Sequence, residues 1–358
     1  MNETSVINEK ITDDNQSEPF FKKYKIHLSV AAAVLVVGVS AFAHYKNERV
    51  KEELVKSLSE YQESLVLMGG ELKYDAIECS GILTTDCEIS ALKFSIMGQE
   101  QLSIGSLRLG DVASLAELKA FSKGENVNTS IDIEADAVAL PKPIIGQMIA
   151  QNVSNAFQQS TLSKLSSINL VFKGEIEGTQ MHLKHLEIDQ FRIDNPIMPL
   201  EFSMSAREVS STAPDSMILE KFSLGIENRA ISDITYESVK SFVDTLQDEE
   251  KAIFLKEFSL TPSDMKERKK ASTAINNAIA KRFEADLSTT PGMVEKELIG
   301  AMIKMLKGET ETIVLEGKNK NDLTMIQIQD ALQQSSAMAI PEAEKYMADK
   351  FKIEVEVD

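Results

Sequence analysis

The stretch VNTSIDIEADAVA, residues 127–139, gives the clearest indication of the fold. Its apolar positions, such as Val127, Ile131 and Ile133, alternate with polar positions, such as Asp132. A period of two predicts an antiparallel strand with one face buried and the other in water. Three other stretches alternate in the same way: residues 168–172, 200–206 and 351–357.

The alternation slips in phase at two places, between Leu183 and Leu186 and between Leu219 and Phe222. We expect a β-bulge or a sheet edge at each slip. Apolar residues with helical spacing interrupt the strands, mainly after residue 230. The pattern therefore predicts a mixed α+β domain, with a β-rich part over residues 71–230 and a helix-rich part over residues 231–358 that ends in a strand.

A separate apolar run, IHLSVAAAVLVVGVSAFA, begins at Ile26 and ends at Ala43. It holds no charged residue, and at 1.5 Å per residue it extends about 27 Å, close to the roughly 30 Å hydrocarbon core of a bilayer. Tyr24 and Tyr45 flank it as interfacial aromatic residues do. We predict a transmembrane signal anchor over residues 24–45.

The basic residues before the run favour a cytoplasmic N-terminus, with residues 1–20 as a disordered cytoplasmic tail. The large domain would then be exported across the inner (cytoplasmic) membrane into the periplasm. Ala41-Phe42-Ala43 has the form of a signal-peptide cleavage site, which leaves a cleaved leader as the alternative. A buried core helix is a third interpretation.

A helix is expected to follow over residues 46–69, because Leu54, Leu58, Tyr61 and Leu65 recur at spacings of three and four. This stripe could pair with a second copy of the chain in a short coiled coil and form a homodimer. Packing on the body of the domain is the favoured interpretation, because the stripe is shorter than three heptads.

Cys79 and Cys87 are the two cysteines of the chain, and their spacing fits two strands joined by a turn. In an exported domain we expect them to form a disulfide. A redox-active pair is the less favoured alternative, because it would need a closer spacing and a helix N-terminus to lower one thiol pKa.

The composition lowers the expectation of several functions. Lys and Arg number 38 against 56 Asp and Glu, giving a net charge of −18, which argues against a nucleic-acid partner. His182 and His185 stand three apart in a predicted strand and should point to opposite faces, so no metal site is expected there. The chain shows no catalytic or cofactor motif, and we predict neither an enzyme nor a cofactor.

Two other groups of residues have competing interpretations. The acidic positions Asp132, Glu134 and Asp136 could collect calcium, but they lack a dedicated binding loop, and a solvated face is favoured. Methionines cluster in residues 293–306, where a helix is expected. They could line an adaptable apolar groove for lipid or peptide, although filling of the core is the favoured interpretation.

Two patterns carry a family resemblance. An N-terminal anchor, followed by Leu72-Lys73-Tyr74 and by LSIGSLRL at residues 102–109, resembles the opening of bacterial YdgA-like and AsmA-like membrane-anchored periplasmic proteins. VLEG at residues 314–317 and DLTM at residues 322–325 are similar in style to their repeated strands. The resemblance implies a β-rich envelope protein that handles lipid or supports envelope assembly, and it transfers no site residue.

The expected fold class is thus α+β: an N-terminal transmembrane helix followed by an exported antiparallel β-meander with packed amphipathic helices. The expected function is a non-enzymatic binding or bridging protein whose partner is lipid or another envelope protein. The alternative is a bitopic scaffold or signalling protein that dimerises through the helix after the membrane.

Overall fold

A computed structural model describes residues 47–66, 69–80, 85–111, 117, 120–121, 123–139, 167–289 and 292–358. Its strands are β1 (Gly70–Lys73), β2 (Ala76–Ser80), β3 (Asp86–Ile96), β4 (Gln99–Gly110), β5 (Val127–Val138), β6 (Ile168–Thr179), β7 (His182–Asp194), β8 (Leu200–Ser210), β9 (Ile218–Glu227), β10 (Thr312–Asn319) and β11 (Phe351–Val357). Its longer helices are α2 (Asn47–Val66), α6 (Ile231–Thr245), α7 (Asp248–Lys256), α8 (Arg268–Thr289), α9 (Met293–Lys307), α10 (Met325–Ser336) and α11 (Ile340–Ala348).

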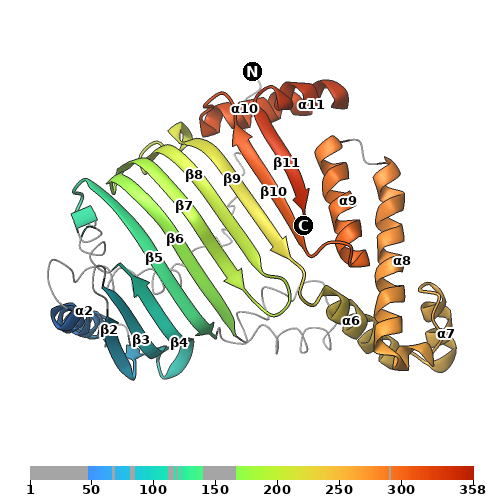
Figure 1. Ribbon diagram of the computed structural model, residues 1–358, viewed down its shortest axis with the longest axis horizontal. Helices are drawn as coiled ribbons and strands as arrows, with labels where there is room; N and C mark the ends of the chain where they lie inside the picture. Colours follow the sequence, from blue (N-terminus) through green and yellow to red (C-terminus); the bar gives the residue numbers. More distant parts are fainter. Residues whose placement is uncertain are drawn as a thin grey trace, which may run out of the picture.

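The strands form one antiparallel sheet of 11 strands in the order β1-β3-β4-β5-β6-β7-β8-β9-β10-β11, with β2 also paired to β3. From β3 to β11 the order in space follows the order in the chain, so the sheet is a meander. Figure 1 shows α2 beside β2 and β3 at one end of the sheet, and helices α6 to α11 gathered at the end formed by β10 and β11. The helices are therefore concentrated at the two ends of the sheet.

The two predicted phase slips are confirmed as β-bulges. On β7 the register with β6 shifts between Leu183 and His185, which leaves Lys184 as the extra residue. On β9 the register with β8 shifts between Leu219 and Lys221, which leaves Glu220 as the extra residue. Because of the extra residue, the apolar side chains on both sides of each bulge lie on the same face of the sheet.

The expected fold class needs correction. The described chain is an antiparallel fold rich in strands, and among its helices none is both long enough and apolar enough to cross a membrane. The longest, α8, is polar along much of its length and includes Arg268, Lys269 and Lys270 in its first turn. The predicted anchor over residues 24–45 lies outside the described residues.

The expected division near residue 230 separates strands from helices along the chain but not in space. β10 follows the helices α6 to α9 in the chain, yet it pairs with β9 along its length, and β11 completes the sheet. The helices have a core of their own around Tyr236, Leu255 and Ile275, while the first strands share a core with α2. One sheet thus joins both regions.

Candidate apolar binding surface

The sheet has one apolar face and one polar face along most of its width. On the apolar face the register aligns side chains from successive strands into three rows that run across the sheet. The rows are Ile133-Phe172-Phe191-Phe202-Leu224-Leu315-Val355, Ala135-Leu170-Ile193-Leu200-Ile226-Ile313-Val357, and Ile131-Gly174-Ile188-Met204-Phe222-Gly317-Ile353. We call this surface the apolar face.

The first row is the most aromatic and continues without a break from β5 to β11. Phe172 and Phe191 meet edge to face, with ring centroids 6.3 Å apart. Phe191 lies opposite Phe202, so that three aromatic residues stand side by side on β6, β7 and β8. Aromatic pairs of this kind stabilise neighbouring strands and also provide a large apolar surface.

Helices cover the two ends of the apolar face. At the first end, Leu54 and Leu58 of α2 are fully buried in a core with Ile89, Leu107 and Leu109. At the other end, Ala301 and Met305 of α9 are buried against Ile313 and Val355 of β10 and β11. Both contacts use apolar helix stripes, as expected for helices that pack on a sheet.

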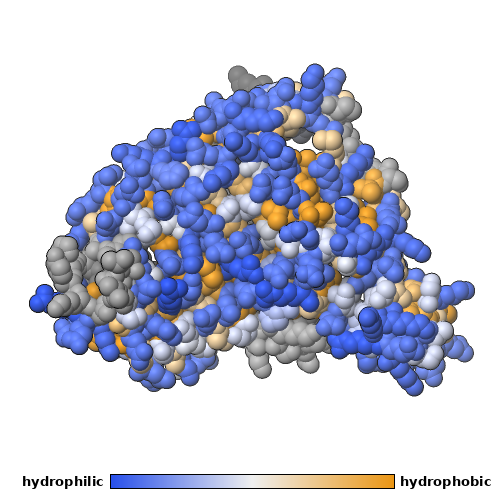
Figure 2. All heavy atoms as spheres, viewed as in Figure 1, coloured by the Kyte–Doolittle hydropathy of each residue, from blue (hydrophilic) through white to orange (hydrophobic). Residues whose placement is uncertain are grey.

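The middle of the apolar face is more accessible. Phe191 keeps 37% and Leu224 keeps 36% of its surface exposed, although both stand in the aromatic row. Within the described parts of the chain, the apolar clusters of α2 and α9 do not include these two residues. The view in Figure 2 instead shows mostly hydrophilic residues over the strands, with scattered hydrophobic ones and a group of hydrophobic residues near β11 and α9.

At β11 the apolar face meets a cavity of about 440 Å³, which we call the C-terminal cavity. Most of its lining is apolar and it includes no Lys or Arg; the residues are Gly292, Met293, Val294, Glu295, Ser335, Ser336, Met338, Ala343, Glu344, Met347, Ala348, Phe351 and Ile353. Met293 is 62% exposed there, and its backbone N–H donates to the carboxylate of Glu344. Of the methionines within residues 293–306, Met293 therefore lines the C-terminal cavity, whereas Met305 is buried in the core.

The opposite, polar face is bound together by ion pairs. Arg108 on β4 donates to Asp86 at 2.8 Å and to Glu134 at 3.1 Å, and Lys173 on β6 lies 2.9 Å from Glu134. The hydrogen bond from Arg108 lowers the pKa of Asp86, and the bond from Lys173 lowers the pKa of Glu134, although burial opposes both shifts. These contacts link four neighbouring strands.

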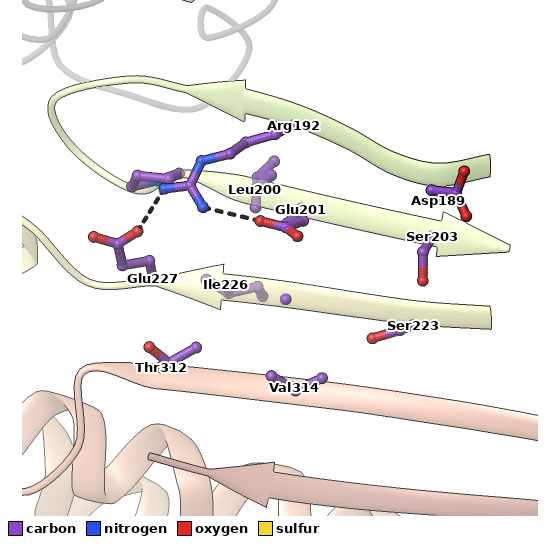
Figure 3. A pocket seen from close by; sticks show the side chains of 12 residues that line it. Asp189, Arg192, Leu200, Glu201, Ser203, Ser223, Ile226, Glu227, Thr312 and Val314 are labelled. Atoms are coloured by element: carbon purple, nitrogen blue, oxygen red, sulfur yellow. Dashed lines mark hydrogen bonds and ion pairs between the residues drawn. The ribbon is translucent and has the colours of Figure 1, made fainter. Parts of the chain in front are cut away.

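A second ion-pair cluster lines a cleft of about 290 Å³ on the polar face over β7 to β10. Figure 3 shows Arg192 held between the carboxylates of Glu201 and Glu227, with a hydrogen bond of 2.9 Å to each. Arg229 also donates a hydrogen bond to Glu227. This bond lowers the pKa of Glu227 below its usual value, although burial acts in the opposite direction. In the wall of the cleft, Arg192 is therefore already paired with Glu201 and Glu227.

The direction of these pKa shifts argues against acid–base chemistry at either cluster. The pKa values of the Asp86, Glu134 and Glu227 carboxyl groups are lowered. The pKa of Arg192 is raised, mainly by its hydrogen bond to Glu201. A general acid or base works best with a pKa near the ambient pH, and these shifts move the pKa values of Asp86, Glu134, Glu227 and Arg192 away from it. The arrangement is that of structural ion pairs.

The predicted disulfide between Cys79 and Cys87 is confirmed. The two residues lie directly opposite each other on β2 and β3, and Cys87 is buried in the core beneath α2. The disulfide closes a loop that contains residues 81–84, which lie outside the described residues. The predicted anchor residues Tyr24, Ile26, Ala43 and Tyr45 also lie outside them.

The stripe predicted for a homodimer, Leu54, Leu58, Tyr61 and Leu65, packs within its own chain. Leu54, Leu58 and Leu65 expose 1% of their surface or less, and burial raises the pKa of Tyr61. The physical reason is the sheet itself, since the apolar residues of β1, β2 and β3 offer α2 a complementary surface in the same chain. The stripe is therefore not free to pair with another copy.

The prediction that His182 and His185 point to opposite faces is wrong. The bulge at Lys184 lets them pair with Thr179 and Glu177, which stand two apart on β6 and so share a face. Each has its own carboxylate, because His182 lies 3.0 Å from Glu208 and His185 lies 3.6 Å from Glu187.

No group of three or more metal-ligating side chains occurs among residues that the structure describes. Of the three acidic positions considered for calcium, Asp132 and Glu134 lie near Lys173, at 3.5 and 2.9 Å. Asp136 stands opposite Ser106. The interpretation as a polar face agrees with these contacts.

Several residues that shape the apolar face carry no distinctive sequence signal. Phe191 and Leu224 fall in alternating segments, but alternation alone does not show that both flank Phe202 across three strands. Arg192 and Arg229 likewise belong to one cluster because both bind Glu227, at the end of β9, which the sequence alone does not show.

A comparison with models of known protein families finds no match for this chain, and a comparison with curated protein sequences finds none either.

Proposed function

We propose that this chain is an exported, membrane-attached, non-enzymatic binding protein, and that its apolar face holds the acyl chain of a lipid. The observation that carries the proposal is the set of three apolar rows that continue from β5 to β11 while helices cover mainly the two ends. Apolar surface in water costs roughly 25 cal/mol per Å², so a strip that none of the described helices covers favours an apolar occupant.

The dimensions of the strip suit one acyl chain. Strands lie about 4.8 Å apart, so the part of the apolar face between the two helix-covered ends, from β7 to β9, is roughly 10 Å wide across the sheet. At about 3.3 Å per residue, β8 with its 11 residues is roughly 36 Å long. One leaflet contributes about half of the roughly 30 Å hydrocarbon core of a bilayer. An acyl chain that spans one leaflet is therefore short enough to lie along β7 to β9 on this strip.

The proposed location outside the cytoplasm is supported by the disulfide between Cys79 and Cys87, because disulfides form and persist in oxidising compartments. Membrane attachment rests on the charge-free run that ends at Ala43. Thiol alkylation of freshly isolated protein tests the location. We expect both cysteines to resist alkylation until a reductant is added, and free thiols would contradict export.

The scaffold alternative receives no support from the structure. It requires an exposed stripe on α2, and Leu54 and Leu58 are buried against the sheet instead. Among the described residues, the two ion-pair clusters hold Asp86, Glu134 and Glu227 in the charged state, which does not favour acid–base catalysis there.

Native mass spectrometry of the full chain, isolated from membranes in a mild detergent, tests the binding function. We expect masses that include co-isolated phospholipid or fatty acid. The double variant Phe191→Gln/Leu224→Gln places amides on the apolar face and should lose most of the bound lipid, because an amide buried without a partner is unfavourable.

Ser203→Gln/Ser223→Gln is the matched control, since these two serines face each other on the opposite, polar side of β8 and β9. It should retain lipid at the level of the unchanged chain. Lipid absent from the unchanged chain, or lost equally in both double variants, would refute binding at the apolar face.

A further inference from the structure

The sheet ends in two edges of different character. At the first edge stand β1 and β2, short strands that pair with β3 at separate places. At the other edge stands β11, which runs without interruption from Phe351 to Val357 and, among the described strands, pairs with β10 alone. Short edge strands resist further pairing, whereas a long regular edge strand leaves backbone groups able to pair with another strand.

The register shows which backbone groups of β11 face outward. Thr312 and Asp358 exchange both of their N–H to O=C hydrogen bonds, at 3.2 Å each. In an antiparallel pair such bonded positions recur at every second residue. The even-numbered residues of β11 therefore bond to β10, and the backbone groups of Phe351, Ile353, Val355 and Val357 point away from it.

We infer that β11 is a self-association surface that pairs antiparallel with β11 of a second copy of this chain, about a two-fold axis at Ile353. In this register Ile353 lies opposite Ile353 of the partner subunit, and Phe351 lies opposite Val355 of the partner subunit. All of these residues present outward-facing backbone groups, so each opposed pair exchanges two hydrogen bonds. The two sheets become one continuous sheet.

The charges on the polar face of β11 favour this register. Lys352 and Glu354 stand two apart, and within one chain their side chains already approach to 2.5 Å. Pairing about Ile353 sets Lys352 opposite Glu354 of the partner subunit, and it does so twice by symmetry. These are non-hydrogen-bonded pairs, in which side chains on neighbouring strands come closest.

The neighbouring register is less favourable. Pairing about Glu354 would set this carboxylate opposite the partner's Glu354, and like charges directly opposite each other destabilise a sheet. Charges on an edge strand often prevent pairing altogether. The register about Ile353 avoids this like-charge contact, because the order of Lys352 followed by Glu354 is complementary to itself there.

On the apolar face, part of β11 remains exposed beside α9. α9 packs over β11 through Val355, on the apolar face, as part of the cluster with Met305 and Ile313. Ile353 and Val357 nevertheless keep 39% of their surface exposed. Pairing about Ile353 would place the two copies of this side chain against each other and remove apolar surface from water.

Sedimentation of the full chain in a mild nonionic detergent tests the inference. We expect a monomer–dimer equilibrium that Lys352→Glu weakens about tenfold or more, because it replaces two opposite-charge pairs by two like-charge pairs. The exchange Lys352→Glu/Glu354→Lys should restore association to within about threefold. Lys318→Glu makes the same change of charge one strand inside the edge and serves as the control.

A second variant and a crosslink test the backbone pairing directly. Ile353→Pro removes an outward N–H that β10 does not use, so it should abolish the dimer while the chain stays folded by circular dichroism. In a mixture of ¹⁴N- and ¹⁵N-labelled chains, a carbodiimide should join Lys352 of one isotope to Glu354 of the other. A chain that remains monomeric, or a dimer that Lys352→Glu and Ile353→Pro leave unchanged, overturns the inference.

Discussion

At the residue scale, the absence of a side chain at Gly317 determines how β9 and β10 fit together. Gly317 lies opposite Phe222, and a Cβ built at Gly317 would overlap the Phe222 ring. We expect Gly317→Ala to lower the free energy of unfolding by about 1–3 kcal/mol, because the ring must leave its position. Urea unfolding followed by circular dichroism measures this change.

The chain offers a matched glycine for comparison. Gly300 lies inside α9, and a Cβ built there would meet no atom within 4 Å. Gly300→Ala should raise the free energy of unfolding by about 0.5–1 kcal/mol, because alanine restricts the unfolded chain and favours the helix. If both substitutions changed the free energy of unfolding equally, the position of the Phe222 ring would not require a glycine at residue 317.

Single residues also show what the sequence could not reveal about the site. The phase slip in β7 was visible in the spacing of Leu183 and Leu186, yet the position of the extra residue was not. That position, Lys184, decides that His182 and His185 share a face. A bulge inserts one residue into a period of two, so an error of one position reverses the predicted face of a side chain.

At the element scale, α2 is held by its contact with the sheet. Leu54 is fully buried among core residues, whereas the next residue, Val55, keeps 39% of its surface exposed. We expect Leu54→Ala to lower the free energy of unfolding by about 2–5 kcal/mol, because it leaves a cavity in the core. Val55→Ala should change it by less than about 1 kcal/mol.

Sedimentation separates this effect from dimerisation through α2. If the stripe packs only on the sheet, Leu54→Ala changes stability and leaves the association state as it is. A shift from dimer to monomer in Leu54→Ala that is absent in Val55→Ala would favour the coiled-coil interpretation instead. The stripe itself could be predicted from its spacing, but its partner could not, because a sheet and a second helix select the same apolar positions.

At the scale of the whole molecule, alternation predicted strands and their faces but not the surface they build. The strands at residues 127–139 and 351–357 were both predictable from a period of two, and both are present. That their apolar residues belong to one surface depends on the order of the strands and on the register of each pair. A period of two holds no information on either, so the apolar face could not be derived from the sequence.

The ion pairs of the polar face predict a characteristic response of the whole sheet to acid. The pKa values of Asp86 and Glu134 lie below their usual range in the folded chain. Their contribution to stability is therefore complete above about pH 5 and is lost as the pH falls through the folded pKa values, below about pH 4. Arg108→Met removes a partner that both carboxylates share.

Because Arg108 and its partners are partly exposed, we expect Arg108→Met to cost about 1 kcal/mol at pH 7. This difference from the unchanged chain should shrink as the pH falls from about 4 through the lowered pKa values of the folded chain, because the carboxylates then become protonated in both proteins. Comparing the two proteins at each pH cancels the general effect of the net charge of −18. Arg282→Met, which removes a mostly exposed pair with Glu257, is the control and should cost less at every pH. A cost of Arg108→Met that stays constant from pH 7 to pH 3 would mean that these ion pairs do not stabilise the sheet.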